Sequence, residues 1–357
     1  MKYDLKNICS QFDIDTNIEL YGNGHINDTY MCETDPRFIL QRININVFKK
    51  PWEVMENIAN VTEFLGKKIK EAGGDVSRET LTLIKTKNGD NYYKYDEENY
   101  FRMYNFVENT VSYELVDRPE QMYNTGVAFG KFQRMLDDYP ADKLFETIVD
   151  FHNTPVRVKQ LNDAIEKNAS GRLEEVREEV AFALKYKKYA SEIVDAMKNG
   201  DVPLRVTHND TKLNNVLFDD TTDEGICVID LDTVMPGSLL YDFGDALRFG
   251  ASSGTEDEKD LSKIWFDLEK FEQFAKGFLE HTASCLTPKE RELLPLSALL
   301  MTYECGIRFL ADYLNGDTYF RTHYEGQNLD RARTQFKLVE DIESKFDKMH
   351  SIIAKYI

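Results

Sequence analysis

The side chains best suited to chemistry lie in a polar loop, residues 208–215, which reads HNDTKLNN. Two short apolar strands follow it, Val216–Phe218 and Ile226–Ile229, with a turn-forming run between them. If these strands pair antiparallel, with 216 opposite 229 and 217 opposite 228, Asn215 falls opposite Asp230. Directly opposed residues in such a ladder lie about 4.5–5.5 Å apart at Cα. The hairpin is therefore expected to bring an amide and a carboxylate together at its open end.

Asn215 and Asp230 each offer an oxygen ligand, which suits a hard cation such as Mg²⁺ that also binds substrate phosphates. Asp210, earlier in the same loop, is expected to face that cation, and Asp232 is expected to support it or to bind a second ion. A carboxylate that receives a hydroxyl proton beside a cation that holds phosphates is what phosphoryl transfer requires. The alternative is a plain polar loop, because Asn and Asp are common turn formers. The apolar strand that ends in Asp after a short hairpin favours the functional interpretation.

Three longer strings carry a specific resemblance: THNDTKLNN at 207–215, IDLDTVMPGS at 229–238 and DFGDALRFGA at 242–251. They resemble the N-acetylhexosamine 1-kinases, a branch of the aminoglycoside phosphotransferase and choline kinase-like superfamily. The similarity runs from Tyr21 to the region of Arg308. It implies an ATP- and Mg²⁺-dependent kinase that phosphorylates the C1 hydroxyl of N-acetylglucosamine or N-acetylgalactosamine, giving the sugar 1-phosphate and ADP. It also implies that Asp210 orients or deprotonates that hydroxyl.

The resemblance implies a bilobal, protein-kinase-like α+β fold. Residues 1–107 are expected to form the nucleotide-binding lobe, a small antiparallel β-sheet with one helix, and residues 108–357 the larger, mainly helical lobe with the catalytic loop and sugar site. The sequence pattern agrees: strands at 18–21, 29–33 and 38–43, a helix at 51–72, and a meander of strands to 107 predict a five-stranded lobe. Helical spacing follows at 120–136, 163–167, 174–199 and 261–281. Further helices are predicted at 296–314, which Pro295 kinks or restarts, and at 331–357.

The turn at 22–27, GNGHIN, lies between the first two predicted strands. Gly22 and Gly24 would let backbone N–H groups approach nucleotide phosphates, because no Cβ intervenes. A plain hairpin is the alternative, but the position at the head of a kinase-like chain favours the phosphate role. His25 and Asn27 are expected to donate hydrogen bonds to phosphate or sugar, or else to stabilise the turn.

The third strand lacks the Lys with which kinases usually bind the α- and β-phosphates. It carries Gln41 and Arg42 instead. Arg42 could replace that Lys, the phosphates could depend on Mg²⁺ and backbone, or Arg42 could face solvent. Tyr104 and Phe106, in the run that leads into the second lobe, are expected to contact adenine or to be ordinary core residues.

Glu304, Arg308 and Asp312 lie four residues apart on one predicted helix face. An ion-pair ladder is one interpretation. The surrounding small and apolar residues predict a buried helix, where an Arg needs a partner or a function. From the resemblance, Arg308 is expected to bind sugar hydroxyls and the N-acetyl carbonyl, and Phe249 is expected to pack on the sugar face.

Asp242, which follows the hairpin, is an alternative to Asp230 as the ligand of the cation. Asp242-Phe243-Gly244 spells the metal-binding triplet of protein kinases, yet Asp230 closes the hairpin that begins at Asn215. We therefore expect Asp242 or Asp245 to cap the next helix or to brace the catalytic loop. His208 is expected to brace the loop as well.

The amino-acid composition limits which partners the protein is expected to bind and where in the cell it is expected to be. With 63 acidic and 44 basic residues, the net charge of −19 argues against nucleic-acid binding through a basic surface. The five cysteines form no C-x-x-C, which favours free thiols in a reducing cytoplasm. No signal sequence or membrane-spanning run is expected. The expected partners are a sugar and ATP, bound by a cytoplasmic monomer.

Three rival functions stay open. An antibiotic kinase would suit the acidic surface, because aminoglycosides are cationic. A choline-type kinase would need an aromatic cage for a quaternary ammonium group. A nucleotide-binding pseudokinase would explain the missing Lys, but Asp210, Asn215 and Asp230 are all present.

Overall fold

The computed structural model describes residues 3–22 and 27–357. The chain divides into two compact units, each discontinuous in sequence. Unit 1 comprises Met1–Ser112, Met135–Val149 and Asn215–Pro236, and unit 2 comprises Tyr113–Arg134, Asp150–Asn214 and Gly237–Ile357. Unit 1 therefore contains the predicted lobe 1–107 and also two later segments, one of which is the hairpin with Asn215 and Asp230. The predicted α+β class is confirmed.

The described residues of unit 1 form a six-stranded antiparallel sheet in the order β1-β2-β3-β6-β4, with β5 also paired to β6. The strands are β1 (Ile18–Leu20), β2 (Asp28–Cys32), β3 (Phe38–Ile43), β4 (Leu83–Ile84), β5 (Tyr93–Lys94) and β6 (Tyr100–Asn105). The prediction of five strands is wrong, because the short strands β4 and β5 both pair along one edge of β6. The register places Gln41 of β3 directly opposite Arg102 of β6.

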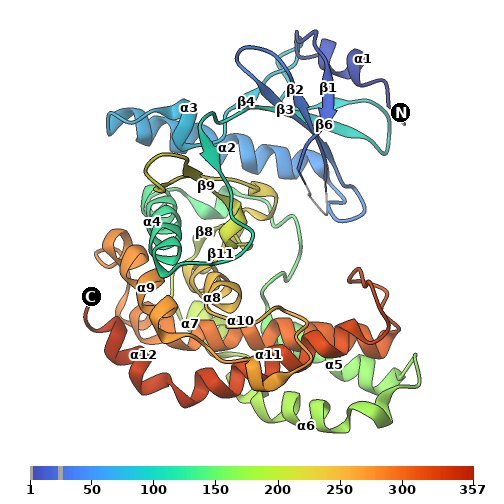
Figure 1. The fold of residues 1–357 in the computed structure, drawn as a ribbon, viewed down its shortest axis with the longest axis vertical. Helices are drawn as coiled ribbons and strands as arrows, with labels where there is room; N and C mark the ends of the chain where they lie inside the picture. The colour runs from blue at the N-terminus through green and yellow to red at the C-terminus, as the bar shows by residue number, and fades with distance from the viewer. Residues whose placement is uncertain (1–2, 23–26) are drawn as a thin grey trace. The chain divides into compact units, whose positions relative to one another are not determined.

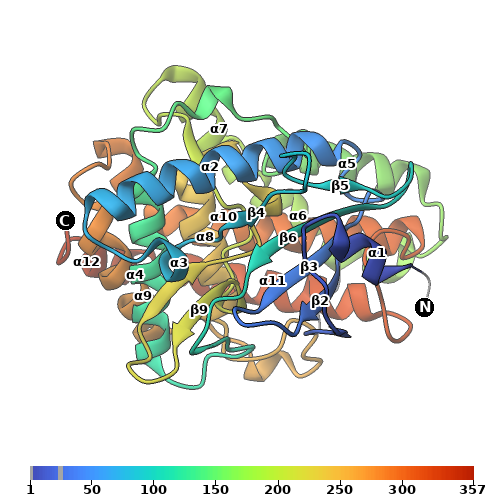
Figure 2. The same cartoon turned by 90° about the horizontal axis from the view of Figure 1, so that it is seen from above.

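Helix α2 (Pro51–Glu71) runs beside this sheet, as Figures 1 and 2 show from two directions. Pro occupies its first turn, where a missing backbone N–H costs nothing, and its buried face includes Val54, Ile58, Val61, Leu65 and Ile69. The short helices α1 (Leu5–Ser10) and α3 (Val76–Glu79) and the 3-10 turn η1 (Ala141–Lys143) complete this part of unit 1. The helix predicted at 51–72 is confirmed.

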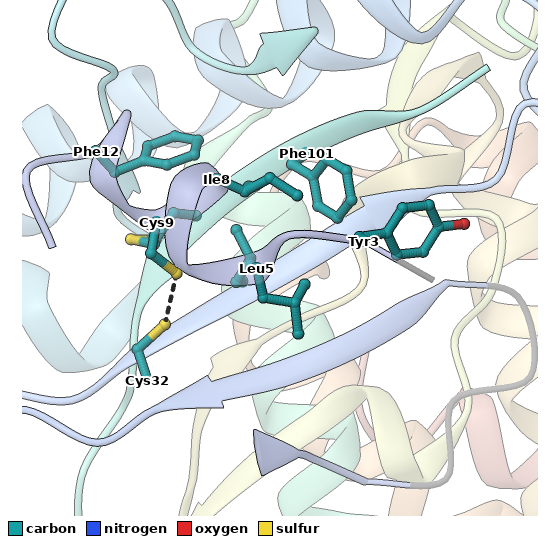
Figure 3. Packing of buried hydrophobic residues seen from close by; sticks show 9 residues of the cluster. Tyr3, Leu5, Ile8, Cys9, Phe12, Cys32 and Phe101 are labelled. Atoms are coloured by element: carbon teal, nitrogen blue, oxygen red, sulfur yellow. Dashed lines mark hydrogen bonds between the residues drawn. The ribbon is translucent and has the colours of Figure 1, made fainter. Parts of the chain in front are cut away.

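Helix α1 covers part of the sheet with an apolar cluster (Figure 3). Leu5, Ile8 and Phe12 pack there with Phe101 of β6. Cys9 and Cys32 meet in the same cluster, with their Sγ atoms 3.5 Å apart. All five cysteines are free thiols, as predicted.

The hairpin of unit 1 consists of β9 (Val216–Asp219) and β10 (Gly225–Val228), and β7 (Thr110–Val111) pairs on the other side of β9. The predicted register is wrong by one residue, because Val216 pairs with Val228 and Leu217 with Cys227. The ladder also has a register shift between Gly225 and Cys227, as a β-bulge produces. The Ile229 N–H donates to the Asn215 carbonyl over 2.9 Å, so Asn215 lies opposite 229 rather than 230.

Unit 2 is mainly helical. Its helices are α4 (Pro119–Met135), α5 (Thr154–Lys167), α6 (Arg177–Tyr186), α7 (Glu192–Asn199), α8 (Leu239–Gly250), α9 (Leu268–Thr282), α10 (Pro288–Asn315), α11 (Gln327–Ser344) and α12 (Phe346–Ile353). Strand β8 (Arg205–Thr207) precedes the polar loop that begins at His208, and β11 (Met235–Gly237) precedes α8. Short 3-10 turns lie at Leu173–Val176, Lys187–Tyr189, Leu213–Asn215, Leu231–Thr233 and Leu261–Lys263.

Several predicted helix limits need correction. The segment 174–199 is two α-helices rather than one, and the last helix divides into α11 and α12 at Lys345. By contrast, α10 is continuous through Pro295 and does not restart there. Its start is as predicted, since the Thr287 side chain accepts from Glu290 N while the Glu290 side chain accepts from Thr287 N.

Helix α10 is the one described helix that is long and apolar enough to cross a membrane. However, 83% of its most apolar window is buried inside the protein. Burial of that kind is what the central helix of a folded core shows, so the length and composition of α10 are weak evidence for a span.

Candidate active site

The polar loop that carries Asp210 is held by a buried carboxylate of unit 2. The Asp242 side chain on α8 accepts hydrogen bonds from the backbone N–H of His208 (2.9 Å) and of Asn209 (2.8 Å), and from Gln133 Nε2 (2.6 Å). Asp242 is fully buried, and that burial raises its pKa against the opposing effect of His208 and the three donors. The cap of α8 is Ser238, whose side chain accepts from Leu240 N. Asp242 therefore braces the loop, one of the two roles expected for it.

Asp245, one turn further along α8, holds the next part of the loop. Its Oδ2 accepts from the Thr211 N–H over 3.0 Å, and its Oδ1 accepts from Arg248 Nε over 3.0 Å. Burial opposes ionisation of Asp245, but the charges of Arg248 and Lys212 prevail and lower its pKa. The backbone on both sides of Asp210 is thus fastened to one helix.

Asp210 itself forms an ion pair with Lys212, with 2.7 Å between Nζ and Oδ1. Burial opposes the charge on Lys212, yet the carboxylates of Asp210 and Asp245 raise the pKa of Lys212 above its ordinary value. The Asp210 side chain is 26% exposed, unlike the sealed acids behind it. A carboxylate that solvent reaches is suited to receive a hydroxyl proton.

His208 lies under the loop, fully buried between the rings of Phe129 and Phe132, with centroid distances of 5.5 and 5.9 Å. Its Nδ1 accepts from the Asp210 N–H over 3.3 Å. The imidazole therefore supports the backbone of Asp210, in agreement with the bracing role expected for it.

Arg308 on α10 is surrounded by aromatic rings. Its guanidinium carbon lies 5.7 Å from the ring centroid of Phe151, 6.0 Å from Tyr319 and 5.5 Å from Phe320. We call these three rings the aromatic collar. No hydrogen bond or ion pair joins Arg308 to the rest of the described chain, so the ion-pair ladder with Glu304 and Asp312 is not formed.

The two acids that flank Arg308 hold the segments of the collar instead. Glu304 accepts from His152 Nδ1 (2.8 Å) and Thr154 Oγ1 (2.6 Å), next to Phe151. Asp312 accepts from the backbone N–H groups of residues 318, 319 and 320, at 3.0, 2.8 and 2.9 Å. The two carboxylates of α10 therefore hold in place the segments that surround the Arg308 guanidinium.

The His152 ring connects this region to the catalytic loop. Its Nε2 lies 3.4 Å from the Asn209 carbonyl oxygen, while its Nδ1 meets Glu304. Nearby, Arg157 uses its Nε and Nη2 on the Phe151 carbonyl, at 3.2 and 2.7 Å. Burial and then the charge of Arg308 lower the pKa of Arg157. Arg157 is thus committed to the backbone, and Arg308 is not.

Phe249, at the end of α8, lines a cavity of about 340 Å³ within unit 2. Leu115, Val116, Arg248 and Gln335 line it as well. Phe249 is not among the rings around Arg308, so its expected contact with the sugar stays a prediction.

In unit 1, Asn215 and Asp230 end the two strands of the β9–β10 hairpin. Asn215 is 7% exposed, and Asp230 adopts a left-handed backbone with φ of 58° before the turn Leu231–Thr233. This turn at 230–233, which we call the acid turn, carries both Asp230 and Asp232. The amide and carboxylate oxygens of Asn215 and Asp230 fit the oxygen ligands that Mg²⁺ prefers. Among the described residues, no cluster of three His, Cys, Asp or Glu forms a fuller protein cage.

Asp232 is buried (4% exposed) and has protein partners at both oxygens. Oδ1 pairs with Arg102 of β6, and Oδ2 accepts from Asn27 Nδ2 over 2.6 Å. Asn27 Oδ1 in turn accepts from the Asn44 N–H over 3.0 Å. Asn27 thus connects Asp232 to the backbone of Asn44. Both roles expected for Asn27, contact with phosphate or sugar and stabilisation of the turn at 22–27, stay predictions, as does cation binding by Asp232.

The other residues expected at the nucleotide have varied surroundings. Gly22 has the left-handed φ of 71° that favours glycine, whereas Gly24 and His25 lie outside the described residues. Arg42 pairs with Asp28 across β2 and β3 at 2.6 Å and is only 16% exposed, so it does not face solvent. Tyr104 is buried in the sheet, and the Phe106 ring packs edge-on against Tyr21. Their nucleotide contacts stay predictions.

Three residues of this region escaped sequence reasoning. Lys212 had a local signal, because it lies two residues after Asp210. Arg102 and His152 had none, since their partners Asp232 and Glu304 lie 130 and 152 residues away in sequence.

The chain is similar to a known protein family and to several solved structures. The sequence profile described as APH, phosphotransferase enzyme family, matches residues 17–274. Among solved structures, a microcompartment-associated aminopropanol kinase is similar with a TM-score of 0.65 and 14% identity, over 97% of this chain and 98% of that one. A spectinomycin phosphotransferase in complex with ADP and spectinomycin has a TM-score of 0.59 at 13% identity, covering 96% and 98%. An amicoumacin kinase in complex with AMP-PNP and Ca²⁺ has a TM-score of 0.60 at 12% identity, covering 96% and 94%.

Proposed function

The chain belongs to the APH phosphotransferase enzyme family, and from this premise we propose that it is an N-acetylhexosamine 1-kinase. It transfers the γ-phosphoryl group of ATP to the C1 hydroxyl of N-acetylglucosamine or N-acetylgalactosamine, giving the sugar 1-phosphate and ADP. Asp210 receives the hydroxyl proton. Asn215 and Asp230 are the residues that would hold Mg²⁺, which supplies charge compensation on the nucleotide phosphates. Lys212 pairs with Asp210 and holds its carboxylate in place.

The surroundings of Arg308 carry the choice of acceptor. A guanidinium has five N–H donors, and contact with ring faces leaves those donors available. Arg308 makes ring contacts at 5.5–6.0 Å and no hydrogen bond within the described chain. An acceptor rich in hydroxyl and carbonyl oxygens, such as an N-acetylhexosamine, matches these donors. The three sequence strings that resemble the N-acetylhexosamine 1-kinases support the same acceptor.

The same observation counts against a choline-type acceptor. A quaternary ammonium group binds to the faces of an aromatic cage. In this protein the cation among the three rings is Arg308 itself. A second positive charge in the collar would be repelled at close range, because like charges within a few ångströms disfavour each other.

Aminoglycoside kinases stay the second candidate, because solved relatives include a spectinomycin phosphotransferase. The net charge of −19 also suits a cationic acceptor. Near Arg308, however, Glu304 and Asp312 use their oxygens on protein donors. A polycation would therefore meet few available carboxylates beside Arg308.

A substrate panel tests the assignment. ADP release would be measured with N-acetylglucosamine, N-acetylgalactosamine, neutral hexoses, choline and kanamycin, and phosphorus NMR would identify the product. We expect turnover with the N-acetylhexosamines and a 1-phosphate resonance. Turnover with kanamycin or choline alone would overturn the sugar assignment. Nucleotide binding without any turnover would favour a pseudokinase.

The role of Arg308 has its own test. Arg308→Ala should raise the KM for the sugar about 10- to 100-fold, since hydrogen bonds to a charged group are each worth about 1.5–3 kcal/mol. The KM for ATP should change little. Arg333→Ala is the matched control, because Arg333 pairs with Glu179 on the helical surface. An unchanged sugar KM in Arg308→Ala would remove Arg308 from the acceptor site.

A further inference from the structure

The missing Lys of β3 leaves the nucleotide site without its usual cation, and the structure places another one beside it. Gln41 occupies β3, and its direct cross-strand partner is Arg102 of β6. Gln41 Oε1 accepts from both Nε and Nη2 of Arg102, at 3.0 and 2.9 Å. The positive charge therefore comes from the neighbouring strand, and the Gln fixes the plane of the guanidinium.

Arg102 is deeply buried, with 1% of its surface exposed. A buried charge is strongly unfavourable unless it is paired and hydrogen-bonded. Its Nη1 pairs with Asp232, and Nη1 also lies 4.0 Å from Met55 Sδ of α2. The three nitrogens are thus all engaged, two on Gln41 and one on Asp232.

The pair belongs to a longer chain of hydrogen bonds. From Asp232 the chain continues through Asn27 to the backbone of Asn44. It connects β3, β6, the acid turn and the end of the glycine turn at 22–27. Each of these segments carries a residue expected at the cation or the nucleotide. A single buried guanidinium lies at the centre of the chain.

Asp230 lies two residues before Asp232 in the acid turn, in a left-handed conformation that is costly for a residue other than glycine. The negative charges of Asp232 and Asp230 both act on Arg102. A guanidinium stays charged in proteins, so Arg102 is a permanent cation beside Asp232.

We propose that Arg102 is a positioning residue for the cation–nucleotide site and supplies the positive charge that the absent Lys of β3 would carry, without itself contacting the phosphates. By binding Asp232 it holds the acid turn in the conformation that presents Asp230, and it neutralises Asp232. Asp230 and Asn215 then remain as the ligands for Mg²⁺. This inference rests on the cation site of the proposed function and is independent of the acceptor.

If Arg102 and Asp232 formed a purely structural ion pair, the expected effect of removing Arg102 would be different. Loss of such a pair lowers the free energy of unfolding and leaves the binding of nucleotide by the folded protein unchanged. Loss of a residue that orients a metal ligand typically costs about 10- to 100-fold in metal affinity. The dependence of ADP affinity on Mg²⁺ separates the two roles without any need for turnover.

The experiment is calorimetric titration of ADP, with and without MgCl₂, on the full chain and its variants. In the unsubstituted protein we expect Mg²⁺ to tighten ADP binding. In Arg102→Gln we expect this tightening to fall about 10-fold or more, with ADP affinity in the absence of Mg²⁺ nearly unchanged. Wild-type tightening in a folded Arg102→Gln protein would overturn the proposal.

Two further variants keep the test decisive. Arg102→Lys retains the charge but cannot make a planar fork, so we expect an intermediate loss, and wild-type tightening would also overturn the proposal. The double variant Gln41→Lys with Arg102→Gln returns a cation to β3. We expect this double variant to recover part of the increase in ADP affinity that Mg²⁺ causes. Failure to recover any would show that the position of the charge on β6 is essential and would overturn replacement of the Lys.

Arg205→Gln is the matched control. Arg205 is also a buried strand Arg, and it pairs with the buried Glu290 within unit 2. We expect it to lower the melting temperature while leaving the effect of Mg²⁺ on ADP binding unchanged. If the unsubstituted protein bound ADP equally with and without Mg²⁺, the cation site of the proposed function would itself be refuted, which is a different outcome from failure of Arg102 alone.

Discussion

Replacing Asp242 by Asn tests whether the catalytic loop depends on α8. The two carboxylate oxygens of Asp242 accept three hydrogen bonds at 2.6–2.9 Å, two of them from the consecutive backbone N–H groups of His208 and Asn209. Asn has almost the same shape, but one of its two ends is an NH₂ group that cannot accept. The substitution therefore places a donor against a buried donor while leaving the packing intact.

The expected loss of stability follows from those bonds. Oδ2 accepts two of the three, so an Asn that keeps its carbonyl there loses the bond from the Asn209 N–H. One bond to a charged acceptor contributes about 1.5–3 kcal/mol, and removal of the buried charge recovers part of its desolvation cost. We expect the free energy of unfolding to fall by about 1–3 kcal/mol. We also expect kcat to fall about 100-fold, since a displacement of about 1 Å at a reacting group has that effect.

Urea unfolding and the rate of ADP release under folding conditions would measure the two effects separately. Glu290→Gln is the control, because Glu290 is an equally buried acid of unit 2 whose partners are Arg205 and the start of α10. It should lose stability while its kcat remains near normal. If Asp242→Asn behaved like this control, with a kcat close to that of the unsubstituted protein, the loop would not depend on α8 and the reasoning would fail.

Four other predictions follow from the same structure. Asp210→Ala should lower kcat by about 10²–10⁴ without unfolding the protein, and a near-normal rate of ADP release would exclude Asp210 as the proton acceptor. Asp312→Asn should increase amide hydrogen exchange at 318–320 and raise the acceptor KM, because Asp312 accepts from those three N–H groups; unchanged exchange would contradict this. Bonds from Thr222, Arg78 and Thr221 lower the pKa of Asp219 from 3.8 to about 2, so its contribution to stability is present above pH 3.8 and is lost as the pH falls through about 2. Urea unfolding of Asp219→Asn from pH 5 to 2 should show a shallower decline than the unsubstituted protein, and parallel curves would refute the shift. The hydrogen bond with Cys32 and burial raise the pKa of Cys9, so a thiol reagent should label Cys9 only as fast as the protein opens, whereas fast labelling in the folded state would contradict the packing of α1.

Local patterns determined much of what the sequence predicted. The helix at α2 was readable because Pro51 and the apolar residues at helical spacing act within a few turns. The start of α10 was readable because Thr287 and Glu290 bond to each other. The prediction of a phosphoryl-transfer site in the loop 208–215 came from the same kind of local signal, since acid, amide and strand occur in one short stretch. The α+β class follows from the order of such elements.

Long-range pairing needed the tertiary structure. The hairpin register differs from the prediction by one residue, because it depends on the geometry of the turn and on the irregularity between Gly225 and Cys227, which the apolar pattern alone does not define. The role of Arg102 depends on Gln41, which lies 61 residues away, and on Asp232, which lies 130 residues away. The separation of Arg308 from Glu304 and Asp312 was likewise not predictable from their spacing, because each acid accepts from donors on other segments of the chain. The sequence determined which charged groups the protein has, and folding decided which of them neutralise one another and which remain available to a ligand, because pairing energy depends on distance in space and on burial.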